Sequence, residues 1–138
     1  MSLEENKALV RRFLEEVWNK GKLALVDEFL ATDYVYHHPT GMVLHGIEKY
    51  KQLVSEVRTA FPDIHFTIDD MVAERDKVVY RWTLRGTHKN EFRGIPPTGK
   101  TVTMWGIFID LISGGKFVES WDRYDTLGLM RQLGVIPE

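Results

Sequence analysis

The chain has 138 residues, 43% of them hydrophobic and 28% charged, which is the size and composition of one ordinary globular domain. Its formal net charge is −2 and no segment is densely basic, which argues against binding to nucleic acid or to an anionic membrane. The chain contains no cysteine, so disulfides, thiolate nucleophiles and zinc–sulfur sites are excluded.

The N-terminal residues are charged and lack the continuous apolar stretch of a signal peptide. No window of the sequence approaches the roughly 18 consecutive apolar residues of a membrane span. We therefore expect one soluble, cytoplasmic domain over residues 1–138, with no membrane partner.

Three helices are predicted within the first 62 residues. Ser2 and Glu5 match the capping-box pattern that begins a helix. The apolar residues that follow recur with helical spacing on one face: Val10, Phe13, Leu14, Val17 and Trp18. A shorter helix with Val26 and Phe29 facing inward should follow, then a short strand over residues 33–39. A third helix is predicted over residues 47–61, and Pro62 ends it.

The second half of the chain is predicted to form strands. Apolar and polar residues alternate from Ile64 to Ile68, and further strands are expected over residues 78–88, 101–113 and 116–124. Gly114-Gly115 is a strong signal for a hairpin between the last two. The proline-containing loop over residues 90–100 is expected to be stiff and to lie at a cavity mouth. Helices followed by strands indicate an α+β fold with an antiparallel sheet, and a short helix should close the chain.

The predicted hairpin selects a candidate catalytic residue. A two-residue turn pairs positions whose numbers sum to 229, so Ile107 would oppose Asp122. One face then carries Trp105, Ile107, Ile109, Leu111, Val118, Ser120, Asp122 and Tyr124, and the other carries Met104, Phe108, Asp110, Phe117, Glu119, Trp121 and Arg123. A lone carboxyl group among apolar side chains has a raised pKa and suits general acid or base chemistry.

Three alternatives remain open for Asp122. It could form an ion pair with Arg81, Arg85 or Arg123, or it could lie at an exposed strand end. A β-bulge would shift the assignment of faces by one residue.

His37 and His38 precede Pro39 at the end of the first predicted strand. Adjacent strand residues point to opposite faces, so at most one of them enters a given cavity. Each is either a catalytic candidate or a loop histidine with a satisfied hydrogen bond. The other three histidines show no ligand spacing, so we predict no metal site.

Four segments resemble the SnoaL-like polyketide cyclase (ester cyclase-like) family. They are FLEEVWNKG (residues 13–21), FPD (61–63), GTH with GIPPTGK (within 86–100) and GGKFVESWDRYDTLGLMRQLG (114–134). The likeness runs from about Asn6 to Gly134. It implies a cystatin-like, nuclear transport factor 2-like cone, in which a curved antiparallel sheet wraps around an N-terminal helix. It also implies a cofactor-free enzyme, often dimeric, with a cavity between sheet and first helix.

The resemblance also implies a chemistry. The family's cyclases close a ring of a polyketide methyl ester by intramolecular aldol condensation, with one aspartate as acid and base. Matched along the closing motif, that aspartate is Asp122. A catalytic histidine of the cyclases would lie near Phe108, which cannot transfer protons, and this leaves His37 or His38 as substitutes.

We therefore predict a cofactor-independent enzyme of this type, acting on a small hydrophobic carbonyl or cyclic substrate by aldol cyclisation or a related isomerase, lyase or hydrolase step. The catalytic candidates are Asp122, His37 and His38; the substrate-binding candidates are Trp18, Trp105, Ile107, Ile109, Ser120 and Tyr124. The alternative is a non-catalytic domain that binds a small molecule or mediates dimerisation. We expect a homodimer through the apolar sheet face that carries Trp121, Phe108 and Phe117.

Overall fold

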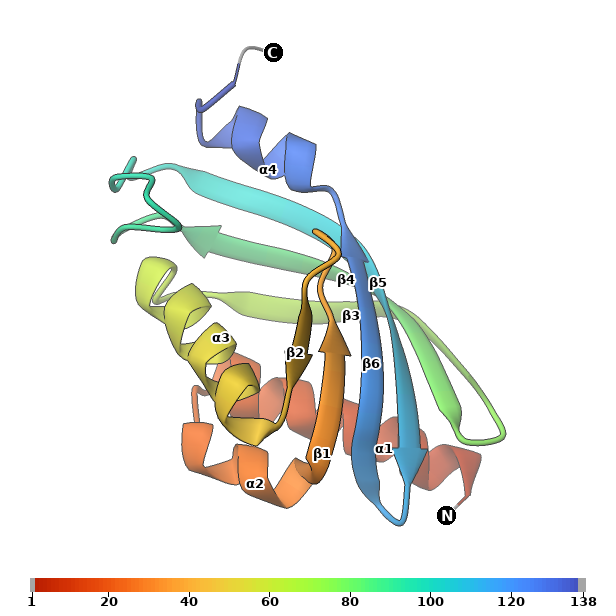
Figure 1. Cartoon of the computed structure of the whole chain (residues 1–138). Helices are drawn as coiled ribbons and strands as arrows, with labels where there is room; N and C mark the ends of the chain where they lie inside the picture. The colour runs from red at the N-terminus through yellow and green to blue at the C-terminus, as the bar shows by residue number, and fades with distance from the viewer. Residues whose placement is uncertain (1, 137–138) are drawn as a thin grey trace.

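The computed structural model describes residues 2–136, in which helices cover the concave side of a curved six-stranded sheet (Figure 1). The helices are α1 (Leu3–Phe13), its π-helical continuation η1 (Leu14–Asn19), the 3₁₀ turn η2 (Leu23–Leu25), α2 (Val26–Phe29), α3 (Ile47–Ala60) and α4 (Thr126–Gln132). The strands are β1 (Leu30–His37), β2 (Val43–His45), β3 (His65–Glu74), β4 (Lys77–Thr87), β5 (Thr101–Ser113) and β6 (Lys116–Tyr124). The predicted α+β class is confirmed.

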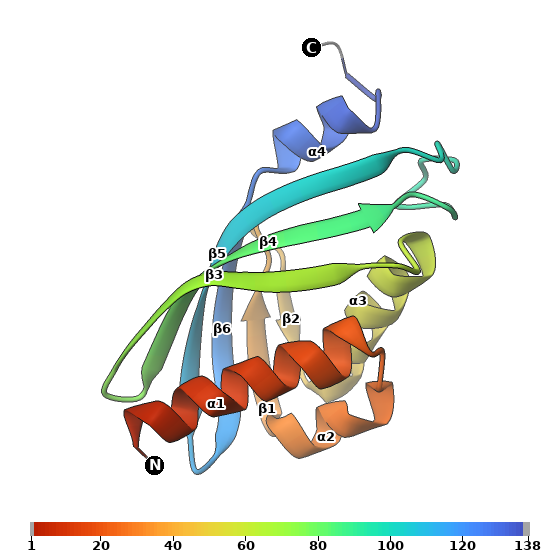
Figure 2. The same cartoon turned by 180° about the vertical axis from the view of Figure 1, so that it is seen from behind.

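The first helix begins as predicted. The Ser2 hydroxyl accepts from the Glu5 backbone N–H at 3.0 Å, and the Glu5 carboxylate accepts from the Ser2 backbone N–H at 3.0 Å. At the other end, the Asn19 side chain bonds both backbone groups of Phe66, at 2.7 and 3.1 Å. This amide bridge ties the end of the helix to β3, and Figure 2 shows the helix crossing in front of the sheet. Trp18 is thereby held against the concave face.

The strand order is β2-β1-β6-β5-β4-β3. All neighbouring pairs among these strands are antiparallel except β1 and β6, which run parallel. The expectation of a purely antiparallel sheet is therefore wrong at this one pair. Local patterns reveal strands but not which distant strand a given one joins, and β1 and β6 are separated by most of the chain. The short strand β2, which pairs with β1, was also not predicted.

A β-bulge changes the pairing of the Gly114-Gly115 hairpin. The register begins as predicted with Ser113 opposite Lys116, and then shifts so that Leu111 opposes Glu119. Asp122 consequently opposes Phe108 rather than Ile107. Directly opposite residues share a face, so the residues of β5 assigned to the two faces are exchanged.

Aromatic side chains fill the space between the helices and the sheet. The Phe13 ring on α1 lies 4.9 Å from the Phe117 ring on β6 and 5.3 Å from the Phe29 ring on α2, measured between centroids. Among the described residues, no helix has the length and apolar character needed to cross a bilayer.

Candidate active site

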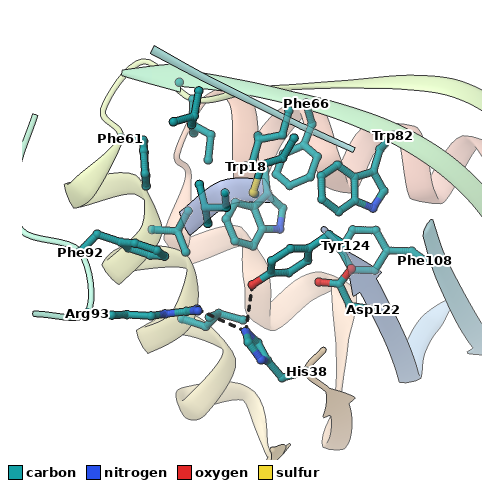
Figure 3. Close-up of a pocket in the computed structure, with 18 of the residues that line it drawn as sticks. Trp18, His38, Phe61, Phe66, Trp82, Phe92, Arg93, Phe108, Asp122 and Tyr124 are labelled. Carbon is teal, nitrogen blue, oxygen red and sulfur yellow. Dashed lines mark hydrogen bonds between the residues drawn. The ribbon is translucent and has the colours of Figure 1, made fainter. Parts of the chain in front are cut away.

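An apolar pocket lies at the wide end of the sheet, between its inner face, α3 and the loop over residues 88–100 (Figure 3). The free volume inside it is about 50 Å³, and it opens to solvent at its mouth. Aromatic rings from the helices, the strands and the loop make up much of the wall: Trp18, Phe61, Phe66, Trp82, Phe92 and Phe108. The loop expected at a cavity mouth contributes Phe92 and Arg93 to the pocket wall.

Asp122 on β6 supplies the carboxyl group of the pocket wall and is only 3% exposed. Its Oδ2 accepts a hydrogen bond from the Tyr36 hydroxyl at 2.5 Å. Its Oδ1 is buried and has no hydrogen-bond partner among the described residues. No ion pair within residues 2–136 includes this carboxyl group; the Arg123 guanidinium donates only to the Asp122 backbone carbonyl, at 2.6 Å.

The surroundings of Asp122 favour its neutral form. Burial raises the pKa of this carboxyl group to about 7, against the opposing effect of the Tyr36 hydrogen bond. The nearby Asp110 carboxylate adds a smaller upward contribution to the same pKa. A group with a pKa near 7 can both accept and donate a proton at neutral pH, as general acid–base catalysis requires.

Asp110 on β5 is a second buried carboxyl group on the inner face, also 3% exposed. Its Oδ1 accepts from the Ser120 hydroxyl at 2.6 Å and its Oδ2 from the Tyr80 hydroxyl at 2.8 Å. Burial raises its pKa to about 6. Asp110 is not part of the pocket wall, and both of its oxygens are used within the protein.

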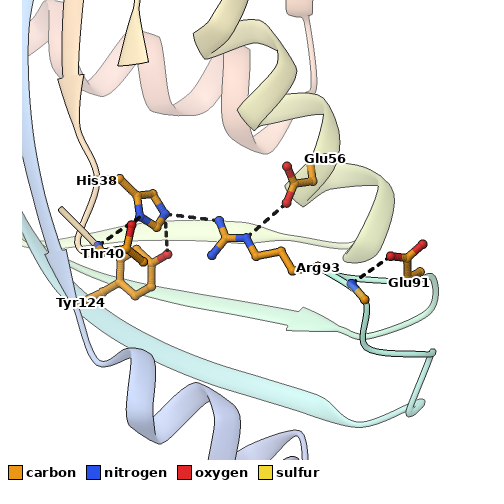
Figure 4. A network of polar contacts seen from close by, with 7 residues as sticks. His38, Thr40, Glu56, Glu91, Arg93 and Tyr124 are labelled. Atoms are coloured by element: carbon orange, nitrogen blue, oxygen red, sulfur yellow. Dashed lines mark hydrogen bonds and ion pairs between the residues drawn. The ribbon is translucent and has the colours of Figure 1, made fainter. Parts of the chain in front are cut away.

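A polar cluster closes one side of the pocket mouth (Figure 4). The Arg93 guanidinium bonds the Glu56 carboxylate at 3.2 Å and His38 Nε2 at 3.3 Å, and the Tyr124 hydroxyl lies 3.2 Å from the same nitrogen. Each ring nitrogen of His38 faces a group that can only donate: Nε2 faces the Arg93 guanidinium, and Nδ1, which lies 2.8 Å from the Thr40 hydroxyl, also faces the Thr40 backbone N–H at 3.2 Å. Burial and the Arg93 charge lower the pKa of His38 to about 4, so the imidazole is neutral at pH 7.

The structure brings four of the predicted site residues to the pocket: Trp18, His38, Asp122 and Tyr124. Ser120 is buried on the inner face but donates to Asp110 and does not line the pocket. His37 lies outside the pocket; its ring stacks on Trp121 with centroids 5.1 Å apart, and its Nε2 lies 2.6 Å from the Glu119 carboxylate.

The predicted cavity-facing position of Trp105, Ile107 and Ile109 is wrong. None of them lines the pocket, and Trp105 is 63% and Ile107 42% exposed. The β-bulge is the cause, because it turns these β5 residues onto the outer face and turns Phe108 and Met104 inward. The alternative of a β-bulge that shifts the face assignment by one residue is therefore the one that the structure shows.

Most of the lining residues were not predicted, and three of those carry polar side-chain atoms: Tyr36, Trp82 and Arg93. Tyr34, Tyr36 and His38 alternate along one strand, and this period of two could have placed Tyr36 beside His38. Gly106, in the middle of a β-rich segment, was a signal that a neighbouring group approaches the backbone closely. Arg93 adopts a left-handed backbone (φ +49°) before Gly94 (φ +82°), a loop geometry that no local pattern indicated.

No group of three or more histidine, aspartate or glutamate side chains within residues 2–136 is arranged to hold a metal ion. The polar side chains of the pocket instead form the Tyr36–Asp122 pair and the cluster of His38, Arg93 and Tyr124, within an otherwise mostly apolar wall. The fold and this pocket define a class of protein: a small α+β cone whose apolar cavity contains one carboxyl group with a free oxygen.

Comparison with known proteins gives the family. The family model described as SnoaL-like polyketide cyclase matches residues 8–133. The aklanonic acid methyl ester cyclase DnrD of Streptomyces peucetius is 31% identical over 132 residues, which cover 91% of this chain and 88% of that protein. The chain therefore belongs to the SnoaL-like polyketide cyclase family.

Solved structures agree with the fold. TsrD from Streptomyces laurentii is 33% identical, with a TM-score of 0.88 and 99% of both chains covered. AclR from Streptomyces galilaeus, a candidate hydroxylase, is 29% identical, with a TM-score of 0.88 over 99% of this chain and 100% of that one. The curved sheet around an N-terminal helix is thus shared with a protein described as a candidate hydroxylase.

Proposed function

We propose that this protein is an acid/base catalyst that closes a ring in a polyketide ester by intramolecular aldol addition. The observation that carries the proposal is the Asp122 carboxyl group, held by Tyr36 through one oxygen while the other is buried in the pocket wall without a partner within residues 2–136. The cyclase relatives support the reaction class. The apolar lining suits a hydrophobic substrate, and no cofactor is needed for the proton transfers that follow.

The proposed reaction uses Asp122 twice. The carboxylate first removes a proton from the carbon next to a substrate carbonyl, which leaves an enolate and a neutral carboxylic acid. The enolate carbon then attacks a second carbonyl of the same molecule, forming a carbon–carbon bond. The resulting alkoxide takes the proton back from Asp122, so the reaction is an isomerisation and the carboxylate is regenerated. Tyr36 keeps the carboxyl group in one orientation through both steps.

His38 has a different role in this proposal from the one its sequence position suggested. Its imidazole is neutral at pH 7, and its Nε2 lies within hydrogen-bond distance of both Arg93 and Tyr124. In this proposal it orients these two side chains at the pocket mouth and does not shuttle the proton. Phe108, near the place of the family's second catalytic group, adds only apolar surface to the wall. Asp122 is consequently the single acid/base of the proposed mechanism.

The direct experiment offers the protein aklanonic acid methyl ester, the compound in the names of two relatives. Ring closure changes no mass, so it is followed by chromatography and absorbance. We expect turnover by the wild type and a fall of about 10²–10⁴-fold in Asp122→Asn, the usual contribution of a general acid or base. Equal rates for the two proteins would contradict the role of Asp122. Saturable binding without turnover would instead support the non-catalytic alternative.

We also propose that the protein forms a homodimer through the outer face of the sheet. The residues of that face differ from those predicted, since Phe108 and Phe117 point inward and only Trp121 of the three lies outside. The exposed side chains of Trp105 and Ile107 extend the apolar area beside it. Light scattering should give twice the monomer mass at micromolar concentration, and Ile107→Lys should reduce it. A monomer mass for the wild type would rule the dimer out.

A further inference from the structure

Two polar side-chain atoms of the pocket wall are buried without a hydrogen-bond partner among the described residues. One is the acceptor Oδ1 of Asp122 and the other is the donor Nε1 of Trp82, whose side chain is only 1% exposed. Buried donors are nearly always bonded in folded proteins, because an unmade hydrogen bond costs about 1–3 kcal/mol. A ligand that carries both an acceptor and an acidic hydrogen could satisfy the unbonded donor and the unbonded acceptor of this pocket.

We propose that the indole N–H of Trp82 is a second catalytic group, which donates a hydrogen bond to the substrate carbonyl oxygen while Asp122 removes the neighbouring proton. The inference rests on the proposed function of Asp122 and deepens it. It specifies the substrate class: an apolar molecule with a carbonyl oxygen and an acidic C–H on the adjacent carbon.

The sheet register places the two groups in neighbouring rows of the same face. Trp82 on β4 opposes Gly106 on β5, and Gly106 opposes Tyr124 on β6; in the next row Phe108 opposes Asp122. Successive rows on one face are about 7 Å apart and β4 lies about 10 Å from β6, with β5 between them, so the long indole must extend across β5 to approach Asp122. Figure 3 shows Trp82 and Asp122 on one side of the pocket, with the Phe108 ring near both.

Gly106 allows the indole to lie across the sheet toward β6. A Cβ atom at this position would be 2.4 Å from Cζ2 and 2.8 Å from Cε2 of Trp82, distances that no packed side chain tolerates. Cε2 is bonded to Nε1, so the edge of the indole that carries the nitrogen is the edge over the glycine. The ring centroid lies 6.0 Å from that of Tyr124, the same-face neighbour of Asp122. The missing side chain of Gly106 thus brings the N–H close to the carboxyl group.

The other donors near Asp122 are already engaged. The Tyr36 hydroxyl donates to Asp122 itself, and the Tyr124 hydroxyl faces His38. The competing explanation for the Trp82 N–H is a contact with an aromatic face. Phe66 is the better placed ring, with centroids 5.1 Å apart and planes at 64°, whereas the Phe108 ring is inclined by only 33°. An N–H held by Phe66 would not respond to an oxygen atom on a ligand.

The proposed role fits the chemistry of the enolate. Negative charge develops on the carbonyl oxygen as the C–H proton leaves, and a fixed donor in an apolar site stabilises that charge more than it stabilises the neutral carbonyl. The indole N–H does not titrate in the physiological range and cannot accept a proton. It therefore stabilises the oxyanion without competing with Asp122 for the transferred proton.

The test uses 2-naphthol as an enol-like probe and 2-methylnaphthalene as the matched compound without oxygen. The four indole N–H signals of ¹⁵N-labelled protein are recorded, and the signal absent from Trp82→Phe assigns Trp82. We expect 2-naphthol to move this signal downfield and 2-methylnaphthalene to leave it nearly in place. Trp82→Phe should weaken 2-naphthol binding about tenfold, the value of one hydrogen bond, with little change for 2-methylnaphthalene. Trp105→Phe, which alters an exposed indole, is the matched control and should bind both like the wild type.

Turnover separates this inference from the proposed function. With aklanonic acid methyl ester, Trp82→Phe should lower kcat about 10–10³-fold while KM changes little. If the Trp82 signal ignores 2-naphthol, or if 2-naphthol does not bind in the pocket, the inference is wrong even where Asp122→Asn abolishes turnover. If Asp122→Asn retains full turnover while the Trp82 signal responds, the acid/base role of Asp122 fails and the donor role of Trp82 stands.

Discussion

Asp110 and Asp122 are both buried carboxyl groups on the inner face of the β5–β6 hairpin, but the protein holds them differently. Asp110 accepts one hydroxyl hydrogen bond on each oxygen and lies outside the pocket. Asp122 accepts one from Tyr36, and its second oxygen has no partner among the described residues. Burial raises the pKa of both, to about 6 for Asp110 and about 7 for Asp122.

The comparison shows that burial alone does not distinguish a catalytic carboxyl group from a structural one. A carboxyl group whose oxygens are both bonded has no means of reaching a ligand, and its donors would lose their acceptor if it were removed. A carboxyl group in a pocket wall with one oxygen unbonded can still contact a ligand that enters the pocket. The hydrogen-bond count therefore supports the proposal that Asp122 is the reactive group, and the following predictions test that difference.

The largest stability change is expected from Asp122→Asn above pH 7. The folded-state pKa is raised, so the folded protein retains a proton that the unfolded chain releases between about pH 4 and pH 7, and stability falls as pH rises through this window. Asparagine removes the charge and can still accept from Tyr36. Urea unfolding should show a gain of up to about 4 kcal/mol at pH 8 and almost none at pH 4. A loss of stability at pH 8 would make Asp122 a structural residue.

Asp110→Ala should act in the opposite direction. It leaves the buried Tyr80 and Ser120 hydroxyls without their acceptor, which should cost about 2–4 kcal/mol at pH 5, where the native carboxyl group is mostly protonated. Asp110→Asn keeps one acceptor and should cost less than half as much. Denaturant melts of the two variants measure the difference. If alanine were tolerated at pH 5, the two hydroxyl bonds would not be what holds Asp110.

Tyr36→Phe should sharpen the comparison by freeing the second oxygen of Asp122. The lost hydrogen bond favoured the charged form, so the pKa of Asp122 should rise above about 7. The rising limb of the cyclisation rate should then move to higher pH, while the plateau falls less than about tenfold. The pH–rate profile of the variant tests this, and a shift to lower pH contradicts the assignment.

The smallest effect is expected at the pocket mouth. Arg93→Met removes the positive charge that, together with burial, lowers the pKa of His38 to about 4. The pKa of His38 should therefore rise toward the ordinary value of about 6.5. An NMR titration of the imidazole signals in the two proteins reports it directly. No change would mean that burial by other side chains alone keeps His38 neutral.

The sequence located Asp122 correctly although its predicted partner strand was out of register. Ser120, Asp122 and Tyr124 all follow the bulge on β6, so their alternation relative to one another is unaffected by it. The opposing β5 residues and Phe117, which precedes the bulge, exchanged faces relative to Asp122, which is why Ile107 and Trp105 were misplaced while Asp122 was not. A bulge depends on packing across the sheet, so the sequence of the Gly114-Gly115 turn does not predict it.

Other parts of the site depend on contacts between distant segments. Arg93 reaches His38 and Glu56 from a loop whose left-handed residue no pattern revealed. Trp82 becomes a pocket donor only because Gly106, on another strand, leaves room for its ring. Helices and strands could thus be predicted from periodicity, and the family motif added the aspartate, but the groups around it required the fold.

The most direct test of Asp122 as acid and base needs no natural substrate. The bicyclic ketone 2-tetralone has an acidic C–H next to its carbonyl, and its exchange for deuterium in heavy water can be followed by proton NMR at pD 8. The wild type and Asp110→Asn should exchange at rates within about tenfold of each other, and both should exceed Asp122→Asn by about 10²–10⁴-fold. Equal exchange by wild type and Asp122→Asn, or an equal loss in both aspartate variants, would contradict a catalytic role confined to Asp122.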